Sequence, residues 1–289
     1  MIKVNIPLET QKFDSQIVNQ NLTSFMSIKN IDISRYDDSF LNTTCQKRIQ
    51  ETHCKTTEEY ATILEQNKLE CELFLNSLQN CYSEFFRNSL SFSVLERIIL
   101  PSLLRRNNTK KNKEIRIWSA ACAYGQEAYS FAMLLEELIS GYEKKPNYRI
   151  FATDQSESKV IEAQRGKYSR EALNSLTMKR VKQWFTKNAD TYTIKPVLKE
   201  NIDFSLFDLF NNTLSCPPTS IFGNFDIVIC ANLLFYYKPN YRKAILEKAT
   251  GCLAENGYII VGEAERDILI NYNFTEIFPQ SGIFKNRKI

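Results

Sequence analysis

Hydrophobic and polar positions follow two different patterns along the chain. Between Leu8 and Leu100 there is neither proline nor glycine, and apolar residues recur three and four positions apart. A long stretch without either helix breaker favours helices joined by short polar turns. We therefore predict a small all-α domain over residues 31–105, in which Thr56 and Glu59 form a capping box at one helix start. Residues 1–30 are polar and weakly periodic, and we assign no role to this N-terminal extension.

From residue 114 onward the pattern changes to strands that alternate with helices. Short apolar runs at 115–118, 148–153, 225–230 and 258–262 predict four strands, separated by helical patterns such as 128–138. Near-continuous apolar strands between helices are typical of a parallel sheet that is covered on both faces. The expected fold is therefore α/β: a doubly wound, mostly parallel, Rossmann-like sheet over residues 114–289. A period-two pattern predicts a small antiparallel β insertion at about 188–206, and residues 106–113 are a predicted linker.

Composition and charge exclude several classes of protein. Hydrophobic residues make up 43% and charged residues 24% of the 289 residues, which are ordinary globular values. The formal net charge of +4 is weak, and the one basic run, RRNNTKKNK, is interpreted as a solvated linker, so no nucleic-acid partner is predicted. No stretch approaches the roughly 20 apolar residues that cross a bilayer, and the N-terminus lacks a signal-peptide pattern. We expect a cytoplasmic protein without membrane insertion.

Cysteine and histidine usage narrows the chemistry. None of the eight cysteines forms a C-x-x-C pair, and His53 is the only histidine, so no metal site is predicted. In the cytosol the cysteines are expected to be reduced. An enzyme of this composition needs a reaction that requires little acid–base help from imidazole.

Four segments that follow predicted strands are candidates for ligand binding, because ligands of open α/β sheets bind at the carboxyl ends of the strands. They are SAACAYGQEAYS with Gly125 and Glu127, the residue Asp154, the pair Asp208-Leu209, and the segment from Asn232 to Tyr237. A carboxylate after the second strand can accept hydrogen bonds from both hydroxyls of a ribose. The G-x-G-x-x-G fingerprint is absent, which disfavours a nicotinamide cofactor. Each residue also has a purely structural reading as a turn, helix cap or core aromatic.

Five segments together resemble a known family. They are IDISRYDDSFLNTTCQKRIQ, EFFRNSLSFSVLERIILPSLL, IRIWSAACAYGQEAYSFAMLL, YRIFATDQSESKVIEAQRGKYSREAL and FDIVICANLLFYYKPNYRKAILEKATGCLAENGYIIVGEAE, in this order between residues 32 and 265. The chain resembles the chemotaxis-type (CheR-type) protein-glutamate O-methyltransferases. The resemblance implies a Rossmann-like methyltransferase domain that uses S-adenosylmethionine and releases S-adenosylhomocysteine.

The resemblance also implies roles for individual residues. Arg87 of the Phe-Phe-Arg motif and Tyr236 are the implied catalytic residues. The implied cofactor-binding residues are Cys81, Ser83, Arg87, Glu127, Asp154, Asp208, Leu209, Ala231 and Asn232. Four of these positions depart from the family pattern: Cys81 and Asp208 stand where asparagine is usual, Ser83 where threonine is usual, and Ala231 where arginine is usual.

The implied reaction transfers a methyl group to a glutamate carboxylate of a protein, most simply a chemoreceptor-like signalling protein. A glutamate side chain is ionised at neutral pH, so no general base is required. The family's receptor-docking helix matches the segment Leu41 to Ile49, where Asn42, Thr43 and Thr44 occupy positions that often carry arginine. Three alternatives stay open: a cofactor-binding scaffold without catalysis, a methyltransferase with a non-receptor protein acceptor, and one that acts on a small molecule.

Overall fold

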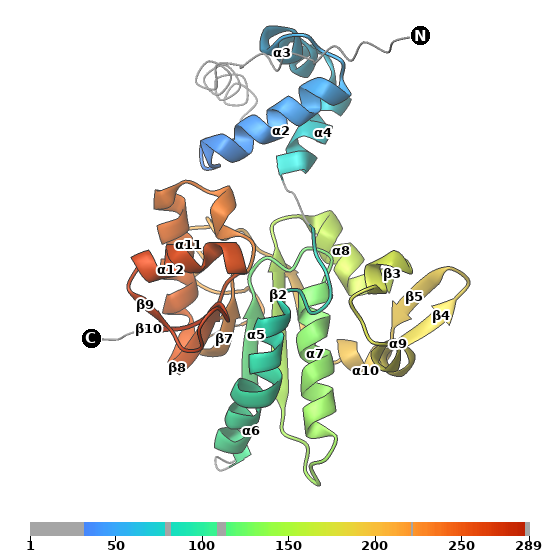
Figure 1. Cartoon of the computed structure of the whole chain (residues 1–289), viewed down its shortest axis with the longest axis vertical. Coiled ribbons are helices and arrows are strands. Elements are labelled where there is room, and N and C mark those ends of the chain that lie inside the picture. The colour runs from blue at the N-terminus through green and yellow to red at the C-terminus, as the bar shows by residue number, and fades with distance from the viewer. Residues whose placement is uncertain (1–31, 79–81, 109–113, 221, 287–289) are drawn as a thin grey trace, which may run out of the picture. The chain divides into compact units, whose positions relative to one another are not determined.

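The computed structural model describes residues 32–78, 82–108, 114–220 and 222–286. Within these ranges the chain divides into two compact units, which Figure 1 shows coloured along the sequence. The first unit ends at Asn80 and also includes Tyr236–Lys238; the second comprises the rest of the chain from Cys81 onward. The predicted N-terminal extension and Cys81 lie outside the described residues. In the described part of the chain, no helix is both long and apolar enough to cross a membrane.

In residues 32–78, the described part of the first unit up to Asn80, the helices are α2 (Asp38–Glu51), α3 (Thr57–Gln66) and α4 (Lys68–Leu78). The predicted cap is present in part, since the Thr56 side chain accepts a hydrogen bond from Glu59 N at 3.2 Å. The Glu59 carboxylate, however, accepts from the backbone N–H of Lys55 instead of closing the box on Thr56. Leu41, Cys45 and Ile49 of α2, with Leu64 of α3 and Phe74 of α4, are buried and form the core of this unit.

An ion pair buried within the first unit gives Arg48 of α2 a structural role. The guanidinium of Arg48 donates two hydrogen bonds to Glu70, and Glu70 also accepts from the hydroxyl of Tyr60 at 2.8 Å. Glu70 is 5% exposed. Arg48 is therefore a structural residue that joins α2 to α4, and the exposed Lys47 is the basic residue of this segment that α2 presents to solvent.

The second unit is built on a seven-stranded sheet. Its strands are β1 (Ile115–Ser119), β2 (Tyr148–Asp154), β6 (Ile202–Leu206), β7 (Phe225–Ile229), β8 (Leu253–Ile260), β9 (Phe274–Glu276) and β10 (Ile283–Asn286). They lie in the order β6-β2-β1-β7-β8-β10-β9. The first five are parallel, and β10 runs antiparallel to both β8 and β9. The predicted doubly wound, Rossmann-like sheet is confirmed, and its direction of winding reverses between β1 and β7.

Helices cover both faces of this sheet. They are α5 (Ser89–Val94), α6 (Leu100–Asn108), α7 (Gln126–Ile139), α8 (Glu157–Arg165), α11 (Pro239–Gly251) and α12 (Arg266–Asn271), and a π-helical turn (Leu95–Ile99) joins α5 to α6. Crossovers between parallel strands are right-handed, so α7 and α11, which wind in opposite directions along the sheet, lie on opposite faces. Ile117, Ile150 and Ile227 pack toward α5–α7, while Trp118 and Phe225 face the other side.

Two boundaries differ from those predicted. Residues 89–108 belong to the second unit, because Leu95, Ile99 and Leu103 share a core with Ile117 and Ala132. A helical pattern shows that a segment is a helix but carries no information about which domain it packs against.

The antiparallel insertion also starts and ends earlier than predicted. It is a three-stranded sheet in the order β3-β5-β4, formed by β3 (Lys167–Tyr168), β4 (Phe185–Asn188) and β5 (Thr191–Ile194). The helices α9 (Met178–Trp184) and α10 (Pro196–Lys199) flank it. Residues 202–206 form β6, a parallel edge strand that pairs with β2. An edge strand is only partly covered, so its side chains alternate as in an antiparallel strand.

Candidate active site

A glycine turn leads from β1 into α7 at the point where the winding of the sheet reverses. Gly125 has φ +87°, and a Cβ atom added there would lie 3.0 Å from the Cβ of Ala163. Ala123, two residues earlier, also has positive φ (46°). Only glycine adopts the conformation of Gly125 without strain, and its missing side chain lets the turn pack closely against Ala163, Tyr129 and Phe204 at the sheet edge.

Asp154 ends the neighbouring strand β2 and is 6% exposed. Its Oδ2 accepts a hydrogen bond from Ala123 N and its Oδ1 accepts one from Ser156 N, each at 3.0 Å. These bonds fix the carboxylate against the glycine turn. Each carboxylate oxygen has two acceptor positions, so both keep capacity for the hydroxyls of a ribose. The predicted role of Asp154 therefore fits its geometry.

Glu127 lies in the first turn of α7, behind the same glycine turn. Its Oε1 accepts a hydrogen bond from the Ser119 hydroxyl at 2.5 Å. Burial raises the pKa of Glu127 to about 7, the hydroxyl of Ser119 and the nearby charge of Arg87 act to lower it, and the charge of Glu265 raises it further. Glu127 therefore shares its surroundings with the predicted catalytic arginine and titrates near neutral pH.

Arg87 follows two anchored phenylalanines. Phe85 is fully buried, and its ring lies edge-on against Tyr168 with 4.9 Å between centroids. The Nη1 of Arg87 donates to the carbonyl of Tyr82 at 2.7 Å, and its guanidinium carbon lies 5.1 Å from the centre of the Tyr82 ring. Ser83, another predicted cofactor residue, is half-buried in the same segment. The predicted cofactor residue Cys81, two positions before Ser83, lies outside the described residues.

Asp208 and Leu209 follow β6, the strand beside β2. The Phe207 N–H donates to the carbonyl of Asp154 at 2.9 Å, which ties the ends of the two strands together. The carboxylate of Asp208 accepts from Phe210 N at 2.9 Å, and Leu209 is 8% exposed. The sheet thus brings these two predicted residues to the same edge as Asp154.

The loop after β7 carries Ala231 and Asn232, and it is held by a residue that the sequence analysis did not assign. Glu265, in the 3-10 turn Glu263–Glu265, is 0% exposed. Its carboxylate accepts four backbone hydrogen bonds of 2.6–2.8 Å, whose donors are the N–H groups of Asn232, Leu233, Leu234 and Gly262. Burial raises the pKa of Glu265, and these four donors act against that effect. Three successive N–H groups that converge on one anion form a nest, which fixes the backbone of the loop.

Gly262 completes this arrangement. A Cβ atom at Gly262 would come within 2.4 Å of the Nδ2 of Asn232, so the close approach requires glycine. Asn232 itself has φ 57°, a left-handed conformation that asparagine adopts more readily than most residues. The sequence signal for this contact is the Gly262-Glu263-Ala264-Glu265 segment after the last parallel strand, where a strand end meets the site.

Tyr236 ends the 3-10 turn Leu234–Tyr236 and belongs to the first compact unit. Its carbonyl accepts from Asp37 N at 2.9 Å, and its ring centroid lies 4.8 Å from that of Phe40. The residue after it, Tyr237, stacks on Tyr36 within the same unit. The catalytic role of Tyr236 stays a prediction from the resemblance.

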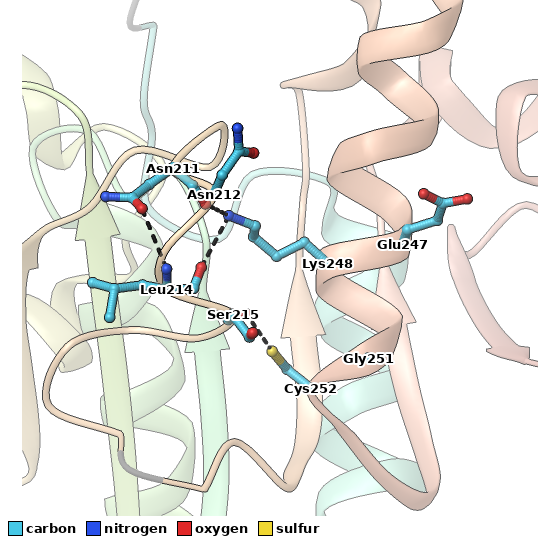
Figure 2. Close-up of a pocket in the computed structure, with 8 residues that line it drawn as sticks. All are labelled: Asn211, Asn212, Leu214, Ser215, Glu247, Lys248, Gly251 and Cys252. Carbon is cyan, nitrogen blue, oxygen red and sulfur yellow. Dashed lines mark hydrogen bonds between the residues drawn. The ribbon is translucent and has the colours of Figure 1, made fainter.

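A cavity of about 380 Å³ lies between α11 and the loop that continues from Asp208. Figure 2 shows Lys248 reaching across it to donate to the carbonyls of Asn211 and Leu214, while the Cys252 thiol donates to Ser215 O at 2.9 Å. Desolvation lowers the pKa of Lys248, and the nearby Asp208 acts to raise it. The ammonium therefore braces the loop that begins with the predicted cofactor residues.

In the described part of the chain, no group of three or more His, Cys, Asp or Glu side chains is placed to hold a metal ion. His53 is exposed, with φ 59°, directly after α2. The seven described cysteines are free thiols, in agreement with the expectation of reduced cysteines.

Comparison with known proteins identifies relatives of this chain. Residues 82–281 match the family model described as CheR methyltransferase, SAM binding domain. The chain is 31% identical over 202 residues to chemotaxis protein methyltransferase 1 of Pseudomonas aeruginosa, an alignment that covers 67% of this chain and 69% of the relative. It is 30% identical over 228 residues to the chemotaxis protein methyltransferase of Borreliella burgdorferi, covering 78% of each protein.

Proposed function

Because the chain belongs to the CheR methyltransferase family, we propose that it transfers the methyl group of S-adenosylmethionine to a glutamate side-chain carboxylate of a protein. The proposed acceptor is a chemoreceptor-like signalling protein in the cytoplasm, in keeping with the names of the relatives. One arrangement supports the proposal: the glycine turn after β1 holds the carboxylate of Asp154 through Ala123 N, and Glu127 in the helical turn that follows is close enough to Arg87 for their charges to interact.

S-adenosylmethionine is the cofactor of this domain, and the residues present fit it. Asp154 keeps acceptor capacity for a ribose diol, and two carboxylates face a cofactor that carries a sulfonium and an ammonium. The Oε1 atom of Gln126, in the first turn of α7, is buried and finds no hydrogen-bond partner among the described residues. A buried acceptor of this kind is costly unless a ligand supplies its donor.

The chain's own residues have a limited task in such a reaction. The bound cofactor supplies a methyl group already activated by the sulfonium. We assign to Arg87 the task of holding a carboxylate, either that of the acceptor or that of the cofactor, through its fork of N–H donors. An acceptor glutamate is ionised at neutral pH, so no residue of the chain needs to remove a proton. Catalysis then rests on positioning and on exclusion of water.

The acceptor is the least constrained part of the proposal. On α2, Thr44 is buried and Arg48 is engaged with Glu70 and Glu51, which leaves Lys47 as the exposed basic residue of the segment that resembles a docking helix. Attraction of an acidic receptor surface by this helix is therefore weaker than a row of arginines would give. We expect receptor methylation by this protein to depend less on ionic strength than arginine-rich docking would.

The test is methyl transfer to purified cytoplasmic fragments of chemoreceptors, using S-adenosylmethionine labelled in the methyl group. Carboxyl methyl esters release methanol in base, so base-labile label on the fragment supports the proposal, and fragments with the acceptor glutamates changed to alanine are the matched control. Wild-type protein that binds the cofactor but labels no fragment would favour a non-catalytic scaffold, which is the alternative that the missing arginine at Ala231 suggests.

A further inference from the structure

The backbone on either side of Arg87 is held in an unfavourable conformation. Phe86 has φ 52° and Asn88 has φ 61°, so both neighbours of the arginine are left-handed. For a bulky residue such as phenylalanine this is an outlier, and such strain costs on the order of 1–3 kcal/mol unless the surroundings fix it. The direction in which Arg87 leaves the main chain therefore depends on what holds Phe86.

Phe86 is held by groups from three other segments of the second unit. Its N–H donates to the Ser130 hydroxyl at 3.0 Å, and its ring lies edge-on to Phe92 with centroids 5.1 Å apart. The guanidinium carbon of Arg180, in α9, lies 4.1 Å from the centre of the Phe86 ring. Stacking of a guanidinium on an aromatic face combines cation–π attraction with flat packing, which only arginine provides.

Arg180 is itself fixed in place. It donates three hydrogen bonds of 2.7–3.2 Å to the carboxylate of Glu137 in α7, and the Trp184 indole donates to the same carboxylate at 3.0 Å. A further carboxylate, that of Glu96, lies 3.7 Å from Arg180. Only 18% of the Arg180 side chain is exposed. The ring of Phe86 is thus covered by the planar guanidinium of Arg180, which its hydrogen bonds to Glu137 hold in place.

We propose that Arg180 is a positioning residue for Arg87: held by Glu137, it clamps the Phe86 ring and so sets the left-handed backbone that aims the Arg87 guanidinium. Arg180 lies in α9, between β3 and β4, and Phe85 packs against Tyr168 and Phe185 of this small sheet. The insertion and the arginine loop therefore form one packed body. The inference rests on the second of the two roles proposed for Arg87, in which its guanidinium holds the carboxylate of the cofactor.

A double-mutant cycle on cofactor binding tests this coupling. The full-length wild type, Arg87→Met, Arg180→Met and the double variant are titrated calorimetrically with S-adenosylhomocysteine, which carries the same carboxylate as the cofactor. Arg180→Met is expected to raise the Kd about tenfold, as loss of a charge-assisted hydrogen bond would. In the Arg87→Met background it is expected to have no further effect, because a residue that acts through another is not additive with it. Arg149→Met, which breaks an ion pair with Asp203 on β2 and β6, is the control and leaves the Kd unchanged.

Two results would overturn the proposal. One is a folded Arg180→Met protein with the wild-type Kd; the other is an equal loss of affinity in the presence and absence of Arg87. If Arg180→Met does not fold, Glu137→Gln replaces it, since this variant removes the negative charge and one of the two oxygen acceptors that hold the guanidinium, yet keeps an acceptor for Trp184. Failure of the proposed function is seen separately, as a wild type that binds the ligand normally but methylates no receptor fragment.

Discussion

The protonation of Glu127 provides the sharpest quantitative prediction. Its pKa is raised to about 7 by burial, from an ordinary value of 4.5. Because the folded state binds this proton more tightly than the unfolded chain, the free energy of unfolding falls as pH rises from about 4.5 to 7 and then stays constant. The difference between the two pKa values corresponds to a loss of about 3 kcal/mol in the cofactor-free protein.

The measurement compares wild type with Glu127→Gln, which keeps the shape of the side chain but cannot ionise. Urea unfolding at pH 5 and pH 8, without cofactor, should show the variant gaining about 3 kcal/mol relative to wild type at the higher pH. Glu137→Gln is a matched control from the same helix. Burial acts to raise the pKa of Glu137, but hydrogen bonds from Arg180 and Trp184 outweigh it and hold the pKa below its ordinary 4.5. Glu137 is therefore ionised in the folded chain, and almost fully in the unfolded chain, from pH 5 upward, so the stability difference between this variant and wild type should stay nearly constant from pH 5 to pH 8.

Cofactor binding should also depend on the Glu127 proton: its loss lowers the stability of the free protein but should strengthen binding of the cofactor. A ligand that carries a sulfonium and an ammonium binds better to ionised Glu127, so the affinity for S-adenosylmethionine should rise with pH through about 7. Binding near neutral pH should then release a proton, which calorimetry detects by comparing buffers with different enthalpies of ionisation. A stability difference between wild type and Glu127→Gln that is the same at pH 5 and pH 8 would refute the reasoning.

Three further predictions concern the sheet edge. Asp154→Ala should abolish calorimetric binding of S-adenosylmethionine, and because it also removes two part-buried hydrogen bonds to Ala123 N and Ser156 N, it should lower the melting temperature by a few degrees without unfolding the protein at the temperature of the titration. Glu265→Gln places a donor opposite backbone donors and should lower the unfolding free energy by roughly 1–3 kcal/mol in urea titrations. Gly125→Ala combines positive φ with a 3.0 Å contact to Ala163 and should weaken cofactor binding in the same calorimetric assay.

The parts of this fold that can be predicted from sequence are those formed by residues that are adjacent along the chain. The strands at 115–119, 148–154 and 225–229 are short apolar runs buried on both faces, and such runs are visible in one dimension. Asp154 is a candidate from sequence because it directly follows such a strand, and strand ends define the ligand-binding edge of an open sheet. The family resemblance supplied Arg87, whose flanking pattern resembles a helix end.

The parts that were missed depend on contacts between residues far apart in sequence. Glu265 acts on backbone N–H groups about 30 positions away, and Arg180 stacks on a ring more than 90 positions away. No local pattern encodes either contact. Arg48 is a third example. A basic residue on a helix surface is expected to be solvated, but the guanidinium of Arg48 is hydrogen-bonded to Glu70, which lies 22 positions later in the sequence.

The geometry around Glu265 also bears on whether Ala231 disables the site. Ala231 stands where the resembling family has arginine, and loss of that side chain is, with Cys81, a reason to consider a non-catalytic scaffold. The loop after β7, however, takes its shape from main-chain N–H groups bound to the Glu265 carboxylate and from the contact between Asn232 and Gly262. Neither depends on the side chain at position 231. The substitution therefore removes one charged group from the site without removing the support of Asn232, and we expect Ala231→Arg to alter cofactor affinity without changing the melting temperature by more than about 2 °C.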